Sequence, residues 1–317
     1  MTRYVVRRLL QMIPLLLGIT VLLFAVIQAA PGGPEAALLQ QDRFIDPAAI
    51  EAYRERLGVD QPVPVQYVRW LGGVVRGDLG ISFSTTRPVS EMILERLPAT
   101  LELMGLSCLI AAILACLLGV TSAIRQYSWF DHLGTGLSFL GIAMPVFWFA
   151  LLLQLLFAVQ LGWLPVSGRG TIGVESLADH LLHLILPATV LSFRYVAGWS
   201  RYLRSSMLEV LRTDYVRTAR AKGLPERVVV WRHALRNAVI PVVSVMALNL
   251  AGLFSGAVIT ETIFSWPGIG RMFVTAMFAR DYPLLMGILL LGSTMVVFFN
   301  LVADIVYGVL DPRIRYE

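Results

Sequence analysis

Two apolar runs with a charged segment between them decide the fold: HLILPATVLSFRYVAGWS (residues 183–200), RYLRSSMLEVLRTDYVRTARAKGLPERVVVWRHALRNA (201–238) and VIPVVSVMALNLAGLFSGAVITET (239–262). Each apolar run has the length of a helix that crosses about 30 Å of bilayer hydrocarbon. The segment between them holds nine of the chain's 26 Lys and Arg residues. It is too long and too helical in composition for a plain connector, so we expect it to dock onto another molecule.

The composition of the whole chain is that of a membrane protein. Of its 317 residues, 57% are hydrophobic and 15% are charged, against roughly 25% charged in an ordinary soluble domain. The mean hydropathy is +0.71. The net charge of +5 does not indicate a nucleic-acid partner, because the basic residues fall in particular loops rather than on one exposed surface. The composition predicts an all-α integral membrane protein.

Six apolar runs predict six transmembrane helices. They cover residues 9–30, 98–124, 134–160, 183–200, 239–262 and 284–308. The first run follows MTRYVVRR, and its 22 uncharged residues exceed the core of an ordinary signal peptide, so we interpret it as a retained anchor. Prolines at positions 14, 145, 187 and 241 are expected to break or bend their helices locally.

The distribution of basic residues predicts the orientation. Fifteen Lys and Arg residues lie in the segments 1–8, 125–133, 201–238 and 309–317, against three in 161–182 and 263–283. By the positive-inside rule, both termini and segment 201–238 are therefore expected in the cytoplasm. The chain then divides into an anchor with a long outer loop (1–97), a transmembrane core (98–310) and a cytoplasmic tail (311–317).

The long outer loop carries helix signals and is expected to be folded. Asp46 and Pro47 precede AAIEAYRERL, which ends at Gly58, and this is the pattern of a capped helix. A second segment begins at Pro64 and ends before Gly77, with Val65, Val68, Leu71 and Val75 on one helical face. The loop either meets an extracytoplasmic partner or lids a pathway, or it only packs on the outer ends of the helices.

Segment 201–238 predicts a helix, a sharp turn and a second helix. Met207, Leu211 and Tyr215 recur every four residues and would share one helical face. Gly223 is expected to end the first helix, and Pro225 to begin a second helix that runs through His233. Such an element can lodge in the groove of a partner. Alternatively, it only sets the topology and contacts anionic lipid.

Several stretches in order along the chain resemble one family, and they span nearly its whole length. They are LGVDQPVPVQYVRWL (57–71), GDLGISF (77–83), RLPATLEL (96–103), GWLPVSG (162–168), DYVRTARAKGLPERVVVWRHALRNAVIP (214–241), WPGIGRMF (266–273), RDYP (280–283) and DPRIR (311–315). They are similar to the permease subunits of bacterial ATP-binding-cassette (ABC) importers of the dipeptide, oligopeptide and nickel class.

This resemblance implies a type I ABC importer transmembrane domain in the bacterial inner membrane. The expected partners are a second homologous permease subunit, two cytoplasmic ATPase subunits, an extracytoplasmic substrate-binding protein and membrane lipid. Arg217, Thr218 and Ala219 fall where the wider superfamily has Glu-Ala-Ala. The candidate ATPase-coupling residues are Asp214, Tyr215, Arg217, Thr218, Ala219, Arg220, Lys222 and Gly223.

Within this set, the hypothesis places Tyr215 and Ala219 against the ATPase, with Arg217 and Arg220 paired to its acids. Force would pass through the turn at Gly223, since ATPase closure can bias the membrane helices only through contacts that differ between states.

The chain itself lacks the phosphate loop of an ATPase. That loop needs Gly-Lys followed by Ser or Thr, whereas the sole lysine, Lys222, lies between Ala221 and Gly223. ATP and Mg are therefore expected on partner subunits, with no cofactor on this chain. A secondary transporter is the alternative, but Glu102, Glu261 and Asp304 lie toward span ends, which disfavours proton coupling.

Two polar residues are candidates for the translocation path. Arg194 lies about eleven residues into the fourth span and either meets a peptide carboxylate or has a structural role. We favour the structural role, in which it pairs with Glu261 or another acid or marks an earlier exit of that helix from the membrane. Asn249 lies beside the small residues Gly252 and Gly256 and faces either cargo or a neighbouring helix. The expected cargo is a di- or oligopeptide, with a nickel chelate or glutathione as alternatives.

The sequence gives no sign of catalysis or of a metal site. The four histidines lie in or beside loops, at positions 132, 180, 183 and 233, and no His-Glu-x-x-His or Gly-x-Ser-x-Gly pattern is present. His180 and His183 share a helical face but lack a carboxylate pair at ligand spacing. We therefore expect a non-catalytic subunit.

Overall fold

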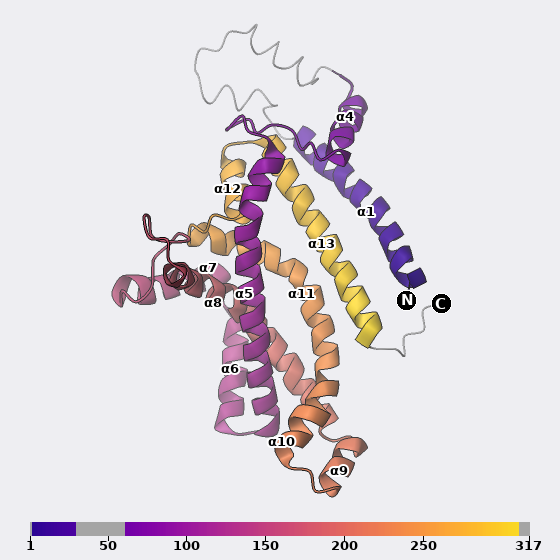
Figure 1. The fold of residues 1–317 in the computed structure, drawn as a ribbon, viewed down its shortest axis with the longest axis vertical. Helices are drawn as coiled ribbons and strands as arrows, with labels where there is room; N and C mark the ends of the chain where they lie inside the picture. Colours follow the sequence, from indigo (N-terminus) through magenta and orange to yellow (C-terminus); the bar gives the residue numbers. More distant parts are fainter. Residues whose placement is uncertain (1, 30–60, 311–317) are drawn as a thin grey trace. The chain divides into compact units, whose positions relative to one another are not determined.

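The computed structural model describes residues 2–29 and 61–310, and these residues form helices without a β-strand (Figure 1). The helices are α1 (Thr2–Gln28), α4 (Val63–Val75), α5 (Val89–Ile124), α6 (Trp129–Ala143), α7 (Val146–Leu153), the π-helical η1 (Gln154–Gln160), α8 (Leu177–Val210), α9 (Asp214–Ala221), α10 (Glu226–Val228), the π-helical η2 (Val229–Ala234), α11 (Leu235–Ile263), α12 (Ile269–Phe278) and α13 (Tyr282–Leu310). The predicted outer helix before Gly58 and the tail 311–317 lie outside the described residues.

Five stretches of helix are long and apolar enough to cross a membrane, and a bent pair of helices makes a sixth if it counts as one span. The five are Val6–Val26, Val89–Ile124, Leu177–Val210, Glu226–Leu250 and Tyr282–Val306. The bent pair is Trp129–Ala143 with Val146–Gln160. The all-α class and the general positions of the predicted spans are confirmed.

The third predicted span is wrong as a continuous helix. Within 134–160 the chain bends by 110° between α6 and α7. Pro145 is the N-cap of α7 with an extended backbone (φ −61°, ψ 133°). Its ring has no N–H for the helical ladder, and Met144 before it adopts the extended conformation (ψ 127°) that proline favours. The proline therefore breaks this span, as was expected at position 145.

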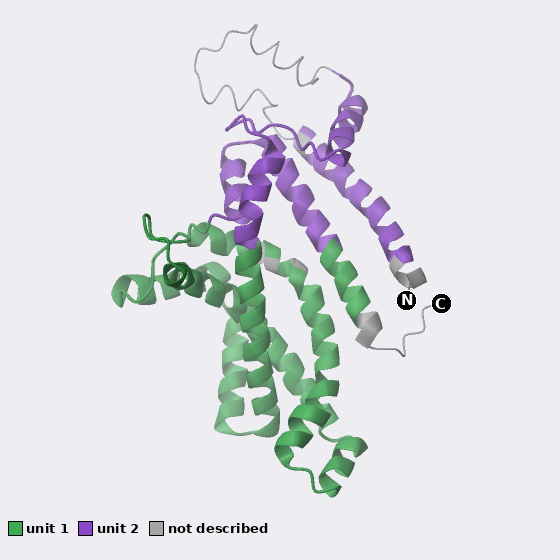
Figure 2. Ribbon diagram, in the orientation of Figure 1, with its two compact units in different colours: residues 1, 101–266, 298–317 green, residues 2–100, 267–297 purple. Residues whose placement is uncertain are grey.

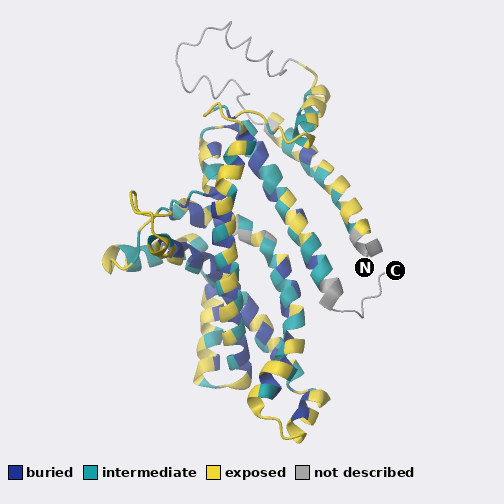
Figure 3. Ribbon diagram, viewed as in Figure 1, coloured by how far each residue is buried: buried dark blue, intermediate teal, exposed yellow. Residues whose placement is uncertain are grey.

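The chain packs as two compact units (Figure 2). Unit 1 contains Leu101–Trp266 with residues from Phe298 onward, and unit 2 contains Thr2–Thr100 with Pro267–Val297. In unit 1, α8 packs against α6, α7 and α11, and buried residues lie along its length (Figure 3). In unit 2, α1 keeps most of its described apolar side chains exposed (Figure 3). These exposed apolar side chains of α1 form a surface for lipid or for another chain.

Helix α4 forms where the sequence predicts it, but the predicted apolar face is not its contact face. Val68 is 67% exposed and Val75 is 81% exposed. Instead, Tyr67 stacks edge-on against Phe24 of α1, with ring centroids 5.5 Å apart. Its hydroxyl also lies 2.9 Å from the Thr20 hydroxyl. The Tyr67 ring covers more apolar area than a valine side chain, and its hydroxyl gives the Thr20 hydroxyl a hydrogen-bond partner. Tyr67 therefore determines which face of α4 packs on α1.

A buried carboxylate in unit 2 joins two of the motif stretches, GDLGISF and RDYP. Asp281 is 0% exposed. It accepts hydrogen bonds from the hydroxyls of Ser82 (2.5 Å) and Ser84 (2.6 Å) and from the N–H groups of Phe83 and Ser84 (both 3.1 Å). Burial alone raises the pKa of Asp281, but these hydrogen bonds outweigh it and hold that pKa below its ordinary value.

Replacing Asp281 by Asn is expected to lower the free energy of unfolding by about 1–3 kcal/mol, because an amide nitrogen then faces N–H and O–H donors. The depressed pKa gives wild type a stabilisation that is present above the unfolded-state pKa and lost as the pH falls through the folded-state pKa. Thermal unfolding of the purified protein should therefore show a gap between the two proteins near neutral pH that closes in acid.

Asp78→Asn is the matched control, since the exposed Asp78 accepts one hydrogen bond, from the Gly80 N–H at 2.9 Å. A D281N protein as stable as wild type at neutral pH would contradict this account of the cluster.

Candidate functional site

The charged segment 201–238 contains a short separate helix at the end of α8 and α11 (Figure 1). α8 ends at Val210, and α9 begins at Asp214 after Thr213, whose backbone is extended (φ −75°, ψ 156°). The Thr213 hydroxyl donates to the Val210 carbonyl at 2.6 Å, a local bond that competes with the helical ladder. The predicted single helix with Met207, Leu211 and Tyr215 on one face is therefore wrong.

Helix α9 is amphipathic and lies against its own chain. Val216 is 0% exposed and Ala219 is 6% exposed, and the helix contacts η2. The Ala219 side chain is covered by the chain itself, and its contact with an ATPase stays a prediction. The other candidate coupling residues are exposed: Asp214, Tyr215, Arg217, Thr218, Arg220, Lys222 and Gly223.

The turn after α9 depends on the backbone of Gly223. Its φ of +75° lies in the left-handed region, which glycine adopts without steric cost. The N–H of Gly223 donates to the Arg220 carbonyl at 2.9 Å. A Cβ added at Gly223 would meet nothing within 4 Å, so backbone conformation and not space selects glycine. The predicted turn is confirmed, and Pro225 caps the next helix as expected.

Two polar contacts brace this turn. The Arg220 guanidinium donates twice to Glu226, at 3.1 Å and 2.6 Å, and this carboxylate raises the pKa of Arg220. The Tyr215 hydroxyl accepts from the Asn237 side-chain amide on α11 at 3.0 Å. Sequence reasoning missed both contacts. Arg220 therefore has an acidic partner within the chain, whereas the Arg217–Asp214 pair is open to solvent, with side chains 72% and 90% exposed.

The two path candidates lie in different environments. Arg194 is exposed on α8 and makes no ion pair among the described residues. Glu261 is 0% exposed and is not its partner, so the favoured pairing is not found. The Asn249 amide donates to the Val245 carbonyl of its own helix at 2.6 Å. A Cβ on nearby Gly252 would lie 3.3 Å from the Tyr195 hydroxyl of α8, which is the close helix contact expected of this glycine.

The histidines are held by neighbouring polar groups. His180 Nε2 bonds to Glu102, which also accepts from Arg169 at 2.7 Å. His183 Nδ1 lies 2.8 Å from the Asp179 carbonyl. In the part of the chain that the structure describes, no group of three His, Cys, Asp or Glu residues is arranged to hold a metal ion.

The fold and this site define a class of protein. It is a multi-pass helical membrane protein with an exposed, internally braced helix and turn between two spans.

The chain belongs to the family described as "Binding-protein-dependent transport system inner membrane component", whose model matches residues 115–316. The N-terminal model of the same kind of protein matches residues 1–104. The chain is therefore an ABC importer permease and a multi-pass inner membrane protein.

Curated relatives match over the full length of both chains. The oligopeptide transport system permease protein AppB of Bacillus subtilis (strain 168) is 46% identical, with 100% of each chain covered. The di/tripeptide permease DppB of Pseudomonas aeruginosa (strain UCBPP-PA14) is 44% identical, and the dipeptide permease DppB of Escherichia coli (strain K12) is 41% identical. Both of these matches also cover 100% of each chain.

Two solved structures share the fold. An inward-facing form of the MetNI methionine ABC transporter matches with a TM-score of 0.58 and 13% identity, covering 69% of this chain and 96% of that one. An amino acid ABC transporter with histidines matches with a TM-score of 0.52 and 12% identity, covering 69% and 94%. The predicted importer transmembrane fold is confirmed.

Proposed function

We propose that this chain forms half of the translocation pathway of an ATP-driven peptide importer. A second homologous permease subunit supplies the other half, two cytoplasmic subunits hydrolyse ATP with Mg, and an extracytoplasmic binding protein delivers di- or oligopeptides. The observation that carries the proposal is the end-to-end match to permeases named for oligopeptides, dipeptides and tripeptides. The exposed α9 element supports the division of labour, since it offers a docking helix to a separate motor.

The coupling residues divide into an inner and an outer set. Val216 and Ala219 hold α9 against its own chain, while Arg220 and Tyr215 brace its ends. Thr218 and Lys222, together with the Arg217–Asp214 pair, remain on the exposed side for the ATPase. Because these contacts keep α9 from rotating against the rest of the chain, a push on its exposed side would move the helices to which it is attached.

The cargo path includes Arg194 in this proposal, with Asn249 on α11 as a second lining residue. A guanidinium facing lipid in the middle of a span costs several kcal/mol, so such residues face a bundle interior or a water-filled cavity. Arg194 is exposed on the isolated chain and has no acidic partner among the described residues. A pathway between two permeases gives it an aqueous surrounding, and a peptide brings a carboxylate to pair with it.

The turn at Gly223 gives the first test. Gly223→Val should abolish ATP-driven uptake of a labelled dipeptide into proteoliposomes that hold the assembled importer, with the permease inserted in wild-type amount. The reason is the left-handed backbone, which costs a branched residue at least ~1–2 kcal/mol. Gly223→Asn is the matched variant, since asparagine tolerates this conformation, and it should keep most of the uptake.

Normal uptake by the G223V assembly would contradict the role of this turn. A wild-type assembly that imports no di- or oligopeptide with ATP would contradict the proposed function itself.

The position of Arg194 gives the second test. Arg194→Gln should raise the KM for peptide uptake about tenfold or more, because a hydrogen bond to a charged group contributes about 1.5–3 kcal/mol. Arg201→Gln serves as the control and should leave KM unchanged. Arg201 lies on the same helix as Arg194, and its guanidinium stacks on Phe139, 4.6 Å from the ring centroid. Uptake with wild-type KM in R194Q would show that Arg194 does not meet the cargo.

A further inference from the structure

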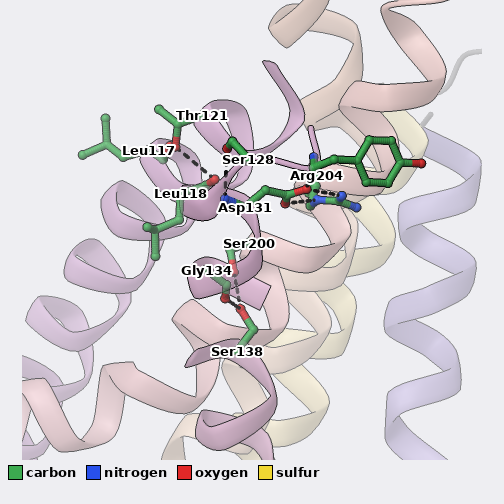
Figure 4. Close-up of polar contacts among 10 residues, drawn as sticks. Leu117, Leu118, Thr121, Ser128, Asp131, Gly134, Ser138, Ser200 and Arg204 are labelled. Carbon is green, nitrogen blue, oxygen red and sulfur yellow. Dashed lines mark hydrogen bonds and ion pairs between the residues drawn. The ribbon is translucent and has the colours of Figure 1, made fainter. Parts of the chain in front are cut away.

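An ion pair between a buried carboxylate and a partly exposed guanidinium joins two parts of unit 1 (Figure 4). Arg204 on α8 donates from Nε to Oδ1 and from Nη2 to Oδ2 of Asp131, both at 2.7 Å. Asp131 is 3% exposed. Its Oδ2 also accepts the Tyr127 N–H at 3.0 Å. Two parallel hydrogen bonds between planar groups fix orientation as well as distance.

The pair connects the turn between α5 and α6 with the helix that leads to α9. Asp131 lies in the first turn of α6, and its N–H donates to the N-cap Ser128 at 3.3 Å. Tyr127 has a φ of +63°, a left-handed conformation that is uncommon for such a residue and that the bond to Asp131 helps to hold. Arg204 lies on the unbroken helix that runs on to Val210, shortly before α9.

The helices beside this pair are in close contact. A Cβ on Gly119 of α5 would lie 2.9 Å from Cβ of Leu203, and a Cβ on Gly141 of α6 would lie 2.8 Å from Cβ of Ala197. The Ser138 and Ser200 hydroxyls, on α6 and α8, lie 3.3 Å apart (Figure 4). Small residues permit this close approach of α5 and α6 to α8.

Stability alone does not explain the ion pair. Burying the Asp131 carboxylate costs desolvation energy, and the Arg204 side chain, 27% exposed, offsets that cost only in part. A bidentate pair between two elements does specify their relative position. The Asp131–Arg204 pair therefore has the properties of a positioning contact.

We propose that Asp131 and Arg204 are positioning residues that clamp the α5–α6 hairpin to the α8–α9 lever, so that a displacement of α9 moves these helices as one body. This inference rests on the proposed function, because it concerns how force from the ATPases reaches the membrane helices. Without the clamp, α9 moves while α6 lags behind, and ATP is hydrolysed with little import.

The test measures how many peptides are imported per ATP hydrolysed by the full importer in proteoliposomes. Asp131→Asn should lower this ratio about tenfold, within the range of coupling between protein sites, while the ATPase rate per folded complex changes less than about twofold. Glu95→Gln is the control, since it breaks an exposed carboxylate–Arg87 pair in unit 2, and it should keep the wild-type ratio. A wild-type ratio in D131N, or import and hydrolysis falling in parallel, overturns the clamp.

A second variant keeps the test independent of the folding of D131N. Asp131→Cys with Arg204→Cys, in a chain whose Cys108 and Cys116 are changed to Ala, is assayed before and after bridging by a short bifunctional thiol reagent. The unbridged protein should import poorly per ATP, and the covalent bridge should restore at least half of the wild-type ratio. An unbridged protein with the wild-type ratio, or a bridge without effect, overturns the proposal. Absence of ATP-driven uptake by wild type would instead overturn the proposed function.

Discussion

Hydrogen bonding of the backbone in hydrocarbon is the constraint on which this structure depends. Lipid offers no partner to an N–H or C=O group, so every membrane-spanning segment must satisfy its own backbone as a helix. The hydrophobic effect does not drive helices together in lipid, so their association depends on close packing of small residues. Gly119 and Gly141 show this directly, because a methyl group at either position would collide with α8. Within the bent span, the helical ladder is interrupted at Pro145, whose ring removes a backbone N–H.

The same constraint explains which parts of the fold follow from sequence. Hydropathy marks the lipid-embedded part of a helix, and the six apolar runs therefore identify the spans. It does not mark where the helix ends, so α8 continues ten residues past its apolar run, from residue 200 to Val210. The bend at Pro145 was foreseeable as a break, but its angle of 110° depends on packing of α7 that no local pattern encodes. The aromatic contact of Tyr67 with Phe24 likewise joins residues far apart in the chain.

In the candidate site as well, features set by neighbouring residues could be predicted from the sequence, whereas contacts between distant residues could not. The glycine turn and its proline are local, and the sequence predicted both. Burial of Ala219 depends on η2, and the pairing of Arg220 with Glu226 depends on the turn closing, so both were missed. Asp131 carried a signal, since Ser128-x-x-Asp131 is the pattern of a helix start. Its partner Arg204, 73 residues away, could be found only from the fold.

The proposed coupling role of α9 requires rigid packing of the helices beyond it. In the proposed coupling, a push on α9 is passed to α8. α8 shares a buried apolar cluster with its neighbours: Ala150 of α7, Leu186 and Val190 of α8, and Phe264 after α11. Val146 and Phe149, next to the break at Pro145, pack on this cluster. α6 and α7 are therefore both attached to α8, on either side of the bend. In the proposed coupling, motion of α8 would therefore reach α6 and α7 through separate contacts, one on each side of the bend at Pro145.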